Sequence, residues 1–226
     1  MLGRVASGEE IEQALEEVIR VYWYPLYGFC RRQGYSDHDA MDCTQGFLTH
    51  LIENKSIAKV ESSRGRFRNF LLVACKNYLK KQYRHAQAQR RRGALGNTIA
   101  IGTLQFSLRY CEEVWDPAES PDRIYERQCV GALLESVTQK VAEIYSRSGK
   151  QSLFEVLSPL ILSPEEALNR SELAENLSMS MAAVNMALHR MRMKYAQVLR
   201  FEVSRHMDGD FSIEEEIKEL LKIVSN

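Results

Sequence analysis

The sequence predicts an all-α fold of two helical domains joined by an irregular linker, with a short helix at the C-terminus. Apolar residues recur at helical spacing through most of the 226 residues, and Ser-led capping patterns precede several of these segments. One region, 96–123, lacks this periodicity and contains glycines and prolines. We therefore expect a first domain at 1–95, a linker at 96–123, a second domain at 124–206 and the C-terminal helix within 207–226.

The first domain is predicted to contain three helices. A capping box at residues 7–10 starts the first helix, and Pro25 is expected to kink or end it. Ser36 can cap the second helix, whose first turn carries two aspartates that the helix dipole favours. A polar loop follows at 54–65. The third helix is predicted to bury a stripe of apolar residues at helical spacing: Phe67, Phe70, Leu71, Ala74 and Tyr78.

Capping signals also mark the helices of the second half. Ser120 is followed by Pro121, which suits an N-cap with proline at the first helical position. A capping box with the same proline position stands at 163–166. Ser212 and Glu215 can cap an acidic, amphipathic C-terminal helix. We expect this last helix either to cover apolar surface of the second domain or to bind a regulator.

The charge distribution points to a nucleic-acid partner. Residues 62–93 carry ten Lys and Arg residues and no Asp or Glu. The whole chain holds 30 residues of each sign, so the remainder is acidic by ten charges. A surface of one sign suits a polyanion, and the interleaved aromatic rings suit unstacked bases: Phe67, Phe70, Tyr78 and Tyr83. The alternative is a solvated helix face, although such a face usually mixes both signs.

Several classes of site are not indicated. The five cysteines are scattered, odd in number and form no CxxC pair, which favours reduced thiols in a cytoplasmic protein over disulfides or a metal site. No run approaches the ~20 apolar residues of a membrane span, and the N-terminal residues contain no secretory signal. No Ser/His/Asp, metal or phosphate-loop constellation is found, and no cofactor is expected.

Residues 171–199 predict a helix-turn-helix. Ala174 is small where two helices would cross, and Val184 continues the buried face. Ser178 occupies the turn position usually given to glycine, and Ser180 can cap the second helix. The residues expected to face outward are Met181, Ala182, Asn185, Met186, His189, Arg190 and Arg192. The alternative is an ordinary helical hairpin with no role in DNA binding.

Three strings of sequence resemble those of a known family. The first is Ser-Asp-His-Asp-Ala-Met-Asp-Cys-Thr-Gln-Gly-Phe-Leu at 36–48, and the second is Gly-Arg-Phe-Arg-Asn-Phe-Leu-Leu-Val-Ala-Cys-Lys-Asn-Tyr-Leu-Lys-Lys-Gln-Tyr-Arg at 65–84. The third is Leu-Ala-Glu-Asn-Leu-Ser-Met-Ser-Met-Ala-Ala-Val at 173–184, followed by His-Arg-Met-Arg at 189–192. With these strings the chain resembles bacterial RNA polymerase sigma factors of the extracytoplasmic-function (ECF) subfamily, over about 11–92 and 124–203.

The resemblance implies a role for each domain. The sigma-two domain would dock on a coiled coil of the largest subunit of the polymerase core through Asp39, Asp42, Gln45 and Phe47, with Met41 where the family usually has glutamate. It would melt and read the promoter minus-ten element through Arg64, Arg66, Phe67, Arg68, Asn77, Lys80, Lys81 and Arg84. The sigma-four domain would read the minus-thirty-five element through Met181, Asn185, Met186, His189, Arg190 and Arg192.

The resemblance also implies partners and regulation. The partners would be the RNA polymerase core and promoter DNA, with an anti-sigma factor or a kinase as a candidate regulator and no membrane. Thr44 lies inside the docking string, so phosphorylation there would change its charge; the alternative is an ordinary solvent-facing threonine. Two other functions stay open at this point. One is a free-standing helix-turn-helix transcriptional regulator, and the other is an RNA-binding adaptor that uses the basic helix.

Overall fold

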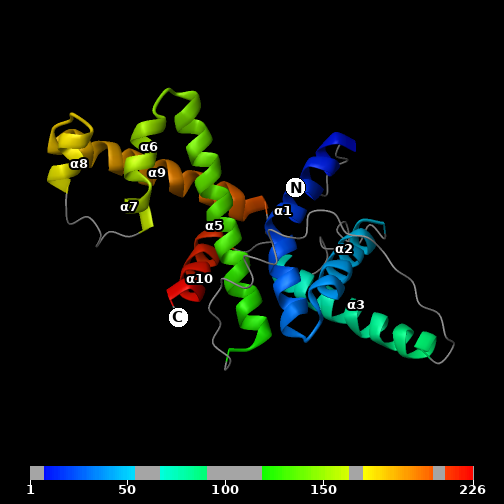
Figure 1. Ribbon diagram of the computed structural model, residues 1–226. Coiled ribbons are helices and arrows are strands. Elements are labelled where there is room, and N and C mark those ends of the chain that lie inside the picture. Colours follow the sequence, from blue (N-terminus) through cyan, green and yellow to red (C-terminus); the bar gives the residue numbers. More distant parts are fainter. Residues whose placement is uncertain (1–7, 54–66, 91–118, 163–169, 206–211, 226) are drawn as a thin grey trace. The chain divides into compact units, whose positions relative to one another are not determined.

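The computed structural model describes residues 8–53, 67–90, 119–162, 170–205 and 212–225 (Figure 1). Every regular element in these ranges is a helix, so the predicted all-α class is confirmed. The helices are α1 (Gly8–Arg32), α2 (Asp37–Glu53), α3 (Phe67–Arg90), α5 (Pro121–Arg147), α6 (Gln151–Leu157), α7 (Pro159–Leu162), α8 (Arg170–Asn176), α9 (Met181–Arg205) and α10 (Ile213–Ser225). Within these ranges no helix combines the length and the apolar character that a membrane crossing requires.

Some predictions fall on residues outside the described ranges. These are the serine of the first capping box, the loop at 54–65, most of the linker at 96–123 and the capping box at 163–166. The helix after the first capping box does form, as does the helix that Ser120 precedes. Ser120 Oγ accepts a hydrogen bond from the Arg123 amide at 3.3 Å, which confirms it as an N-cap with Pro121 at the first helical position.

The described helices form two compact units. Unit 1 comprises Met1–Ala132 and Arg205–Asn226, and unit 2 comprises Leu133–Ser204. The division lies inside α5, and α10 belongs to unit 1 although it follows unit 2 in the sequence. The C-terminal helix is therefore part of unit 1, and the two roles predicted for it stay predictions. The domain limits and domain roles expected from the sequence remain predictions.

The core of unit 1 is built on the second half of α1. Side chains from Val21 to Cys30 are buried, with Trp23 half-buried, so this part of the helix is apolar nearly all round. Of the two outcomes predicted for Pro25, a kink or an end of the helix, the end is wrong, since α1 continues through it to Arg32. A proline inside a helix costs about 3 kcal/mol, and the burial of apolar side chains on both sides offsets that cost. Helices α1, α2 and α3 pack together around this core (Figure 1).

A tight turn joins α1 to α2. Gly34 has a φ of +91°, and the amides of Gly34 and Tyr35 donate to the carbonyls of Arg31 and Cys30 at 3.0 and 3.3 Å, which is a Schellman motif. Ser36 Oγ accepts a hydrogen bond from the Asp39 amide at 3.2 Å, which confirms the predicted cap of α2.

One aspartate then locks the first turn of α2 onto α1. The Tyr27 hydroxyl donates to Asp37 at 2.5 Å, and the Arg31 guanidinium donates to the same oxygen at 3.1 Å. Asp37 therefore has two fixed donors from α1, and the direction of α2 is set by them.

The buried face of α3 lies slightly to one side of the predicted stripe. Phe67 and Leu71 are buried as predicted, whereas Phe70, Ala74 and Tyr78 are only half-buried. The other buried apolar side chains in the described part of α3 are Leu72, Cys75 and Leu79. The rotation follows from packing on two sides, because α3 contacts both α1 and α2 and must present apolar atoms to each.

A buried ion pair joins α3 to α10. The Arg68 guanidinium contacts the Glu216 carboxylate, and the two side chains are only 7% and 6% exposed. The Tyr125 hydroxyl of α5 donates to the Arg68 carbonyl at 3.1 Å. Burial raises the pKa of Tyr125 and of Tyr22, which lies near the pair, so both phenols are neutral. The pair therefore lies in a water-poor interior, where each charge needs its partner.

The core of unit 2 gathers side chains from α5, α6, α8 and α9. Val137, Phe154, Ala174, Val184 and Leu188 are all buried within it. A second ion pair ties α5 to α9 inside this unit, because Lys140 Nζ lies 2.6 Å from the buried Glu202 carboxylate. The end of α9 is therefore held against α5, while its first turns remain available at the surface.

The Arg68–Glu216 pair yields a stability prediction. Replacing Glu216→Gln leaves Arg68 buried without a counter-charge, so we expect the free energy of unfolding to fall by about 3–5 kcal/mol in urea denaturation followed by circular dichroism. Glu215→Gln is the matched control, because that side chain is exposed on the same helical turn and its change should stay within about 0.5 kcal/mol. Equal losses in the two variants would contradict the assignment.

Candidate nucleic-acid interface

The outward face of α2 presents the predicted docking residues, with one exception. Asp39 and Gln45 are exposed and Asp42 is half-exposed. Asp39 also accepts a hydrogen bond from the Ser36 hydroxyl at 2.7 Å, so its carboxylate is oriented at the start of the helix. Phe47 is the exception: it is 1% exposed and belongs to the core of unit 1, so it supports α2 and cannot contact a partner. Met41 is buried as well.

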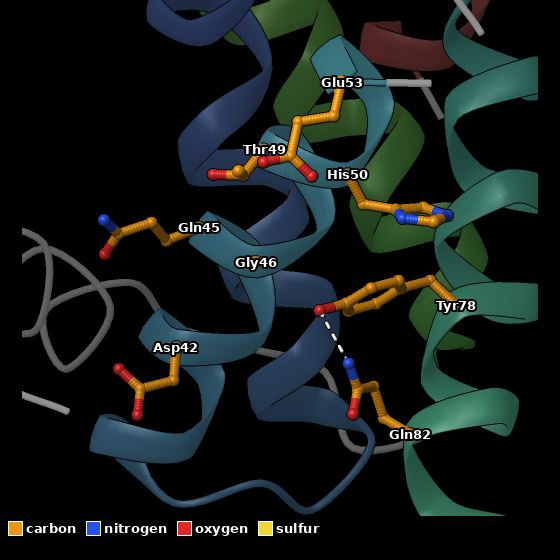
Figure 2. A pocket seen from close by; sticks show the side chains of 8 residues that line it. All are labelled: Asp42, Gln45, Gly46, Thr49, His50, Glu53, Tyr78 and Gln82. Atoms are coloured by element: carbon orange, nitrogen blue, oxygen red, sulfur yellow. Dashed lines mark hydrogen bonds between the residues drawn. The ribbon is translucent and has the colours of Figure 1, made fainter. Parts of the chain in front are cut away.

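A shallow cleft of about 440 Å³ lies between α2 and α3 beside this face. Figure 2 shows Asp42, Gln45, Thr49 and Glu53 following one another along α2, while the Tyr78 ring reaches across from α3 toward Gly46. The remaining lining residues are His50 and Gln82. The cleft thus continues from the predicted docking residues to the basic helix.

Gly46 permits the close approach of α2 and α3 at this cleft. A Cβ at this position would lie 2.5 Å from the Tyr78 hydroxyl oxygen, so any other residue would require the end of the Tyr78 side chain to move. Gln82 Nε2 donates to the same oxygen at 2.8 Å. Burial raises the pKa of Tyr78, so the ring is a neutral wall of the cleft.

The structure corrects the phosphorylation hypothesis for Thr44. Its side chain is 0% exposed, and its hydroxyl donates to the Ala40 carbonyl at 2.7 Å. A kinase cannot reach this oxygen in the folded unit, and the alternative of a solvent-facing threonine is wrong too. The neighbouring Cys43 is half-buried, and burial raises the pKa of its thiol to about 12. The negative charge of the α2 face therefore comes from its carboxylates, which include Asp39, Asp42 and Glu53.

The second half of α3 forms an exposed basic face. Asn77, Lys80, Lys81 and Arg84 are exposed, as predicted for residues that hold a nucleic-acid strand. Among the ion pairs between described residues, none involves Lys80, Lys81 or Arg84. Because α3 is packed on its other side, these charges are carried at fixed spacing.

Tyr83 belongs to this face and was not among the predicted site residues. Its ring is 61% exposed, next in sequence to Arg84 and one helical turn from Lys80. An exposed tyrosine on an otherwise polar helix end is a platform on which an unpaired base can stack. The interleaving of aromatics with cations was the sequence signal, and exposure separates Tyr83 from the buried rings of the same stretch.

The first half of α3 does not present the predicted minus-ten residues. Phe67 is 6% exposed and packs edge-on against Tyr22 with ring centroids 5.4 Å apart. Arg68 is held in the buried pair with Glu216. Lys76, on the next turns, lies 2.5 Å from Asp122 and over the Phe29 ring. Arg64 and Arg66 lie outside the described residues.

Helices α8 and α9 meet at a tight turn at the place where the sequence predicts a helix-turn-helix. The Ser178 and Met179 amides donate to the carbonyls of Glu175 and Ala174 at 3.0 and 2.9 Å, which is a Schellman motif with Ser178 at φ +50°. The turn therefore needs a left-handed residue and uses serine in place of glycine. Ser180 Oγ accepts from the Ala183 amide at 3.2 Å, which confirms the predicted cap of α9.

The first turns of α9 are exposed on the predicted side. Met181 and Met186 are 42% and 56% exposed, and Ala182, Asn185, His189 and Arg190 are exposed too. Arg192 differs from the prediction. It is half-buried, and its guanidinium donates to the Leu160 carbonyl of α7 at 2.9 Å. Arg192 therefore satisfies a helix-end carbonyl and positions α9, and it does not belong to the outward face.

A second acid-free stretch coincides with α9. No Asp or Glu occurs from Asn176 to Phe201, while Arg190, Arg192, Lys194 and Arg200 do. The sequence prediction relied on the longer basic stretch and missed this shorter one. The absence of acids along a helix whose first turns are exposed is compatible with an approach to DNA phosphates.

Comparison with known proteins adds no assignment: no family model, curated protein or solved structure matches this chain. Among the described residues, no group of three or more His, Cys, Asp or Glu side chains is arranged to hold a metal ion.

The turn between α8 and α9 yields a prediction. Ser178→Gly removes the cost of a left-handed side chain, so the free energy of unfolding should rise by about 1 kcal/mol. Gly149→Ser is the reciprocal variant. In the native chain Gly149 closes α5 with the same motif at φ +68°, and a Cβ added at this position would meet nothing within 4 Å. We expect this variant to lose about as much as the first one gains in urea denaturation. A destabilising Ser178→Gly would show that the hydroxyl matters more than the backbone.

Proposed function

We propose that this chain is a sigma factor that binds the RNA polymerase core and directs promoter recognition, DNA melting and the initiation of transcription. It is a specificity subunit and not an enzyme, since catalysis belongs to the polymerase. It acts in the cytoplasm, where core and promoter are found. The resemblance to the ECF subfamily motivates the proposal, and the exposed surfaces of both units support it.

The observation that carries the proposal is that unit 1 has two surfaces of opposite charge. The α2 face is acidic and polar, whereas the outward face of α3 is basic and includes an exposed aromatic ring. An acidic surface suits a protein partner, and a basic surface with an aromatic suits a single nucleic-acid strand. A protein that melts promoter DNA on a polymerase needs both surfaces at once.

The energetics of melting favour this division of work. Unstacking a base costs a few kcal/mol, and stacking on an aromatic side chain returns ~1–3 kcal/mol per base. Lys80, Lys81 and Arg84 add phosphate contacts, whose strength falls with salt. Unit 2 supplies duplex recognition through the exposed first turns of α9, because a helix-turn-helix inserts this part of its second helix into the major groove.

Run-off transcription tests the function directly. Purified chain is added to core polymerase with promoters from the genome that encodes it, and a promoter-dependent transcript is the expected product. A gel shift of duplex DNA by the chain alone, tight and specific, would favour the free-standing regulator. Binding to single-stranded RNA in preference to DNA, without any affinity for core, would favour the RNA-binding adaptor.

The α2 face yields a prediction about core binding. Replacing Asp42→Ala together with Gln45→Ala removes two exposed groups of the docking face, so we expect affinity for core polymerase to fall about tenfold. Glu143→Ala is the control, because it also removes one exposed carboxylate but lies on α5 in unit 2. Surface plasmon resonance with immobilised core measures both. A loss of affinity of equal size in the control would show that the effect comes from net charge and not from the docking face.

Tyr83 yields a prediction about strand binding. Tyr83→Ala should lower the affinity of the full chain for a single-stranded oligodeoxynucleotide between about fivefold and a hundredfold, because a stacking platform is lost. Tyr83→Phe should keep the affinity, since the ring remains. Val73→Ala is the matched control, because Val73 is a 58% exposed apolar residue of the same helix. Fluorescence anisotropy measures all three, and equal losses in the alanine variants would contradict stacking.

A further inference from the structure

We infer that the exposed first turns of α9 read A·T base pairs through the thymine methyl group, with Met186 as the residue that contacts the methyl. This inference rests on the proposed function and deepens it, because it names the class of promoter sequence that unit 2 selects. It follows from the side chains exposed on the reading face, which is the exposed side of the first turns of α9, and from the arginine that turns away from that face.

The reading face is apolar at its centre. Ala182, Met186, His189 and Met193 follow each other at i, i+4, i+7 and i+11, so they form one stripe along α9. All four are exposed, with Met186 and Met193 at 56% and 59%. Both methionines are flexible enough to fit an irregular partner.

The structure also removes a cation from this face. Arg192 turns inward to the Leu160 carbonyl, so Arg190 is the arginine that stays exposed in the first three turns of α9. Arginine is the side chain that most often reads guanine, through O6 and N7. A face with one arginine and several apolar groups is therefore poorly suited to a G·C-rich element.

Thymine offers the chemistry that this face complements. Its C5 methyl group is the apolar feature of the major groove, and alanine and other apolar side chains contact it. Adenine, its partner, presents N6 and N7 to an amide side chain. Asn185 lies beside Met186 on the exposed side of α9. One A·T pair can thus be read from both bases, the adenine by the amide and the thymine by the thioether.

A protein partner is the competing occupant of this stripe. DNA is favoured because Met186 lies in the first two turns of α9, directly after the Ser178 turn, where a helix-turn-helix places its base contacts. The acid-free stretch from Asn176 to Phe201 is complementary in charge to DNA. Met193 lies two turns beyond Met186, and it therefore separates the two occupants in an experiment.

The test compares thymine with uracil, which lacks only the methyl group. Holoenzyme assembled from core and full-length chain selects duplexes from a pool with a randomised upstream segment, and the selected duplexes are then made with either base. We expect A·T pairs to be enriched, and the thymine form to bind about fourfold more tightly per contacted methyl. Met186→Ala should abolish this ratio, whereas Met193→Ala should keep it.

Each other outcome overturns the inference. A thymine-to-uracil ratio near one in the unmodified chain, or a ratio that survives in Met186→Ala, shows that the methyl is not read by this side chain. Loss of core affinity in both methionine variants, with the ratio intact, assigns the stripe to a protein partner. Holoenzyme that transcribes from a promoter but enriches no A·T pairs refutes the inference alone. Failure to enrich any sequence or to make any transcript refutes the proposed function as well.

Discussion

The buried contact between Arg68 and Glu216 constrains unit 1 more than any other single interaction. Both charges have left water, and each would be costly without the other, so α3 and α10 must meet wherever the rest of the unit folds. The Tyr125 hydroxyl bonds the backbone at Arg68, which brings α5 to the same place. Three segments far apart in the sequence are thereby fixed together, and the acidic C-terminal helix becomes part of the first unit instead of a free tail.

This constraint divides the basic stretch into an inner and an outer part. Arg68 and Lys76 form ion pairs with acids of the chain itself, Arg68 with Glu216 and Lys76 with Asp122. The cations of the following turns, from Lys80 to Arg84, keep their exposure. In the sequence this stretch looks like one uniform surface for binding a polyanion. In the structure it is a buried anchor followed by an exposed face. The anchor holds the helix still, and a rigid helix presents the remaining charges and the Tyr83 ring in a defined geometry.

Sequence reasoning succeeded where the signal is local. The all-α class and the caps at Ser36, Ser120 and Ser180 depend on residues within one or two turns, and all are confirmed. It failed where a segment distant in the sequence determines where a side chain lies. Helical spacing cannot reveal that Arg68 meets a residue 148 positions away, that Arg192 turns to a carbonyl of α7, or that Thr44 and Phe47 face the α1 core. A helix end at Pro25, one of the two outcomes predicted there, is wrong for the same reason, since burial of neighbouring residues outweighs a local penalty.

The modest charge of the α9 face is informative in the context of the proposed function. A reader with one outward arginine in its first turns gains little from phosphate contacts, so its affinity as an isolated module would be weak. Weak contacts become useful when they are linked, because a second contact on the same chain forms at high effective concentration and can raise overall binding by 10²–10⁴. Under the proposed function, the basic face of α3 and the exposed turns of α9 would be linked in this way once α2 is held on a large partner. Specificity would then come from apolar and amide contacts to bases, which discriminate without strengthening binding to every sequence. The acidic remainder of the chain acts in the same direction, because it opposes non-specific association of the free protein with DNA.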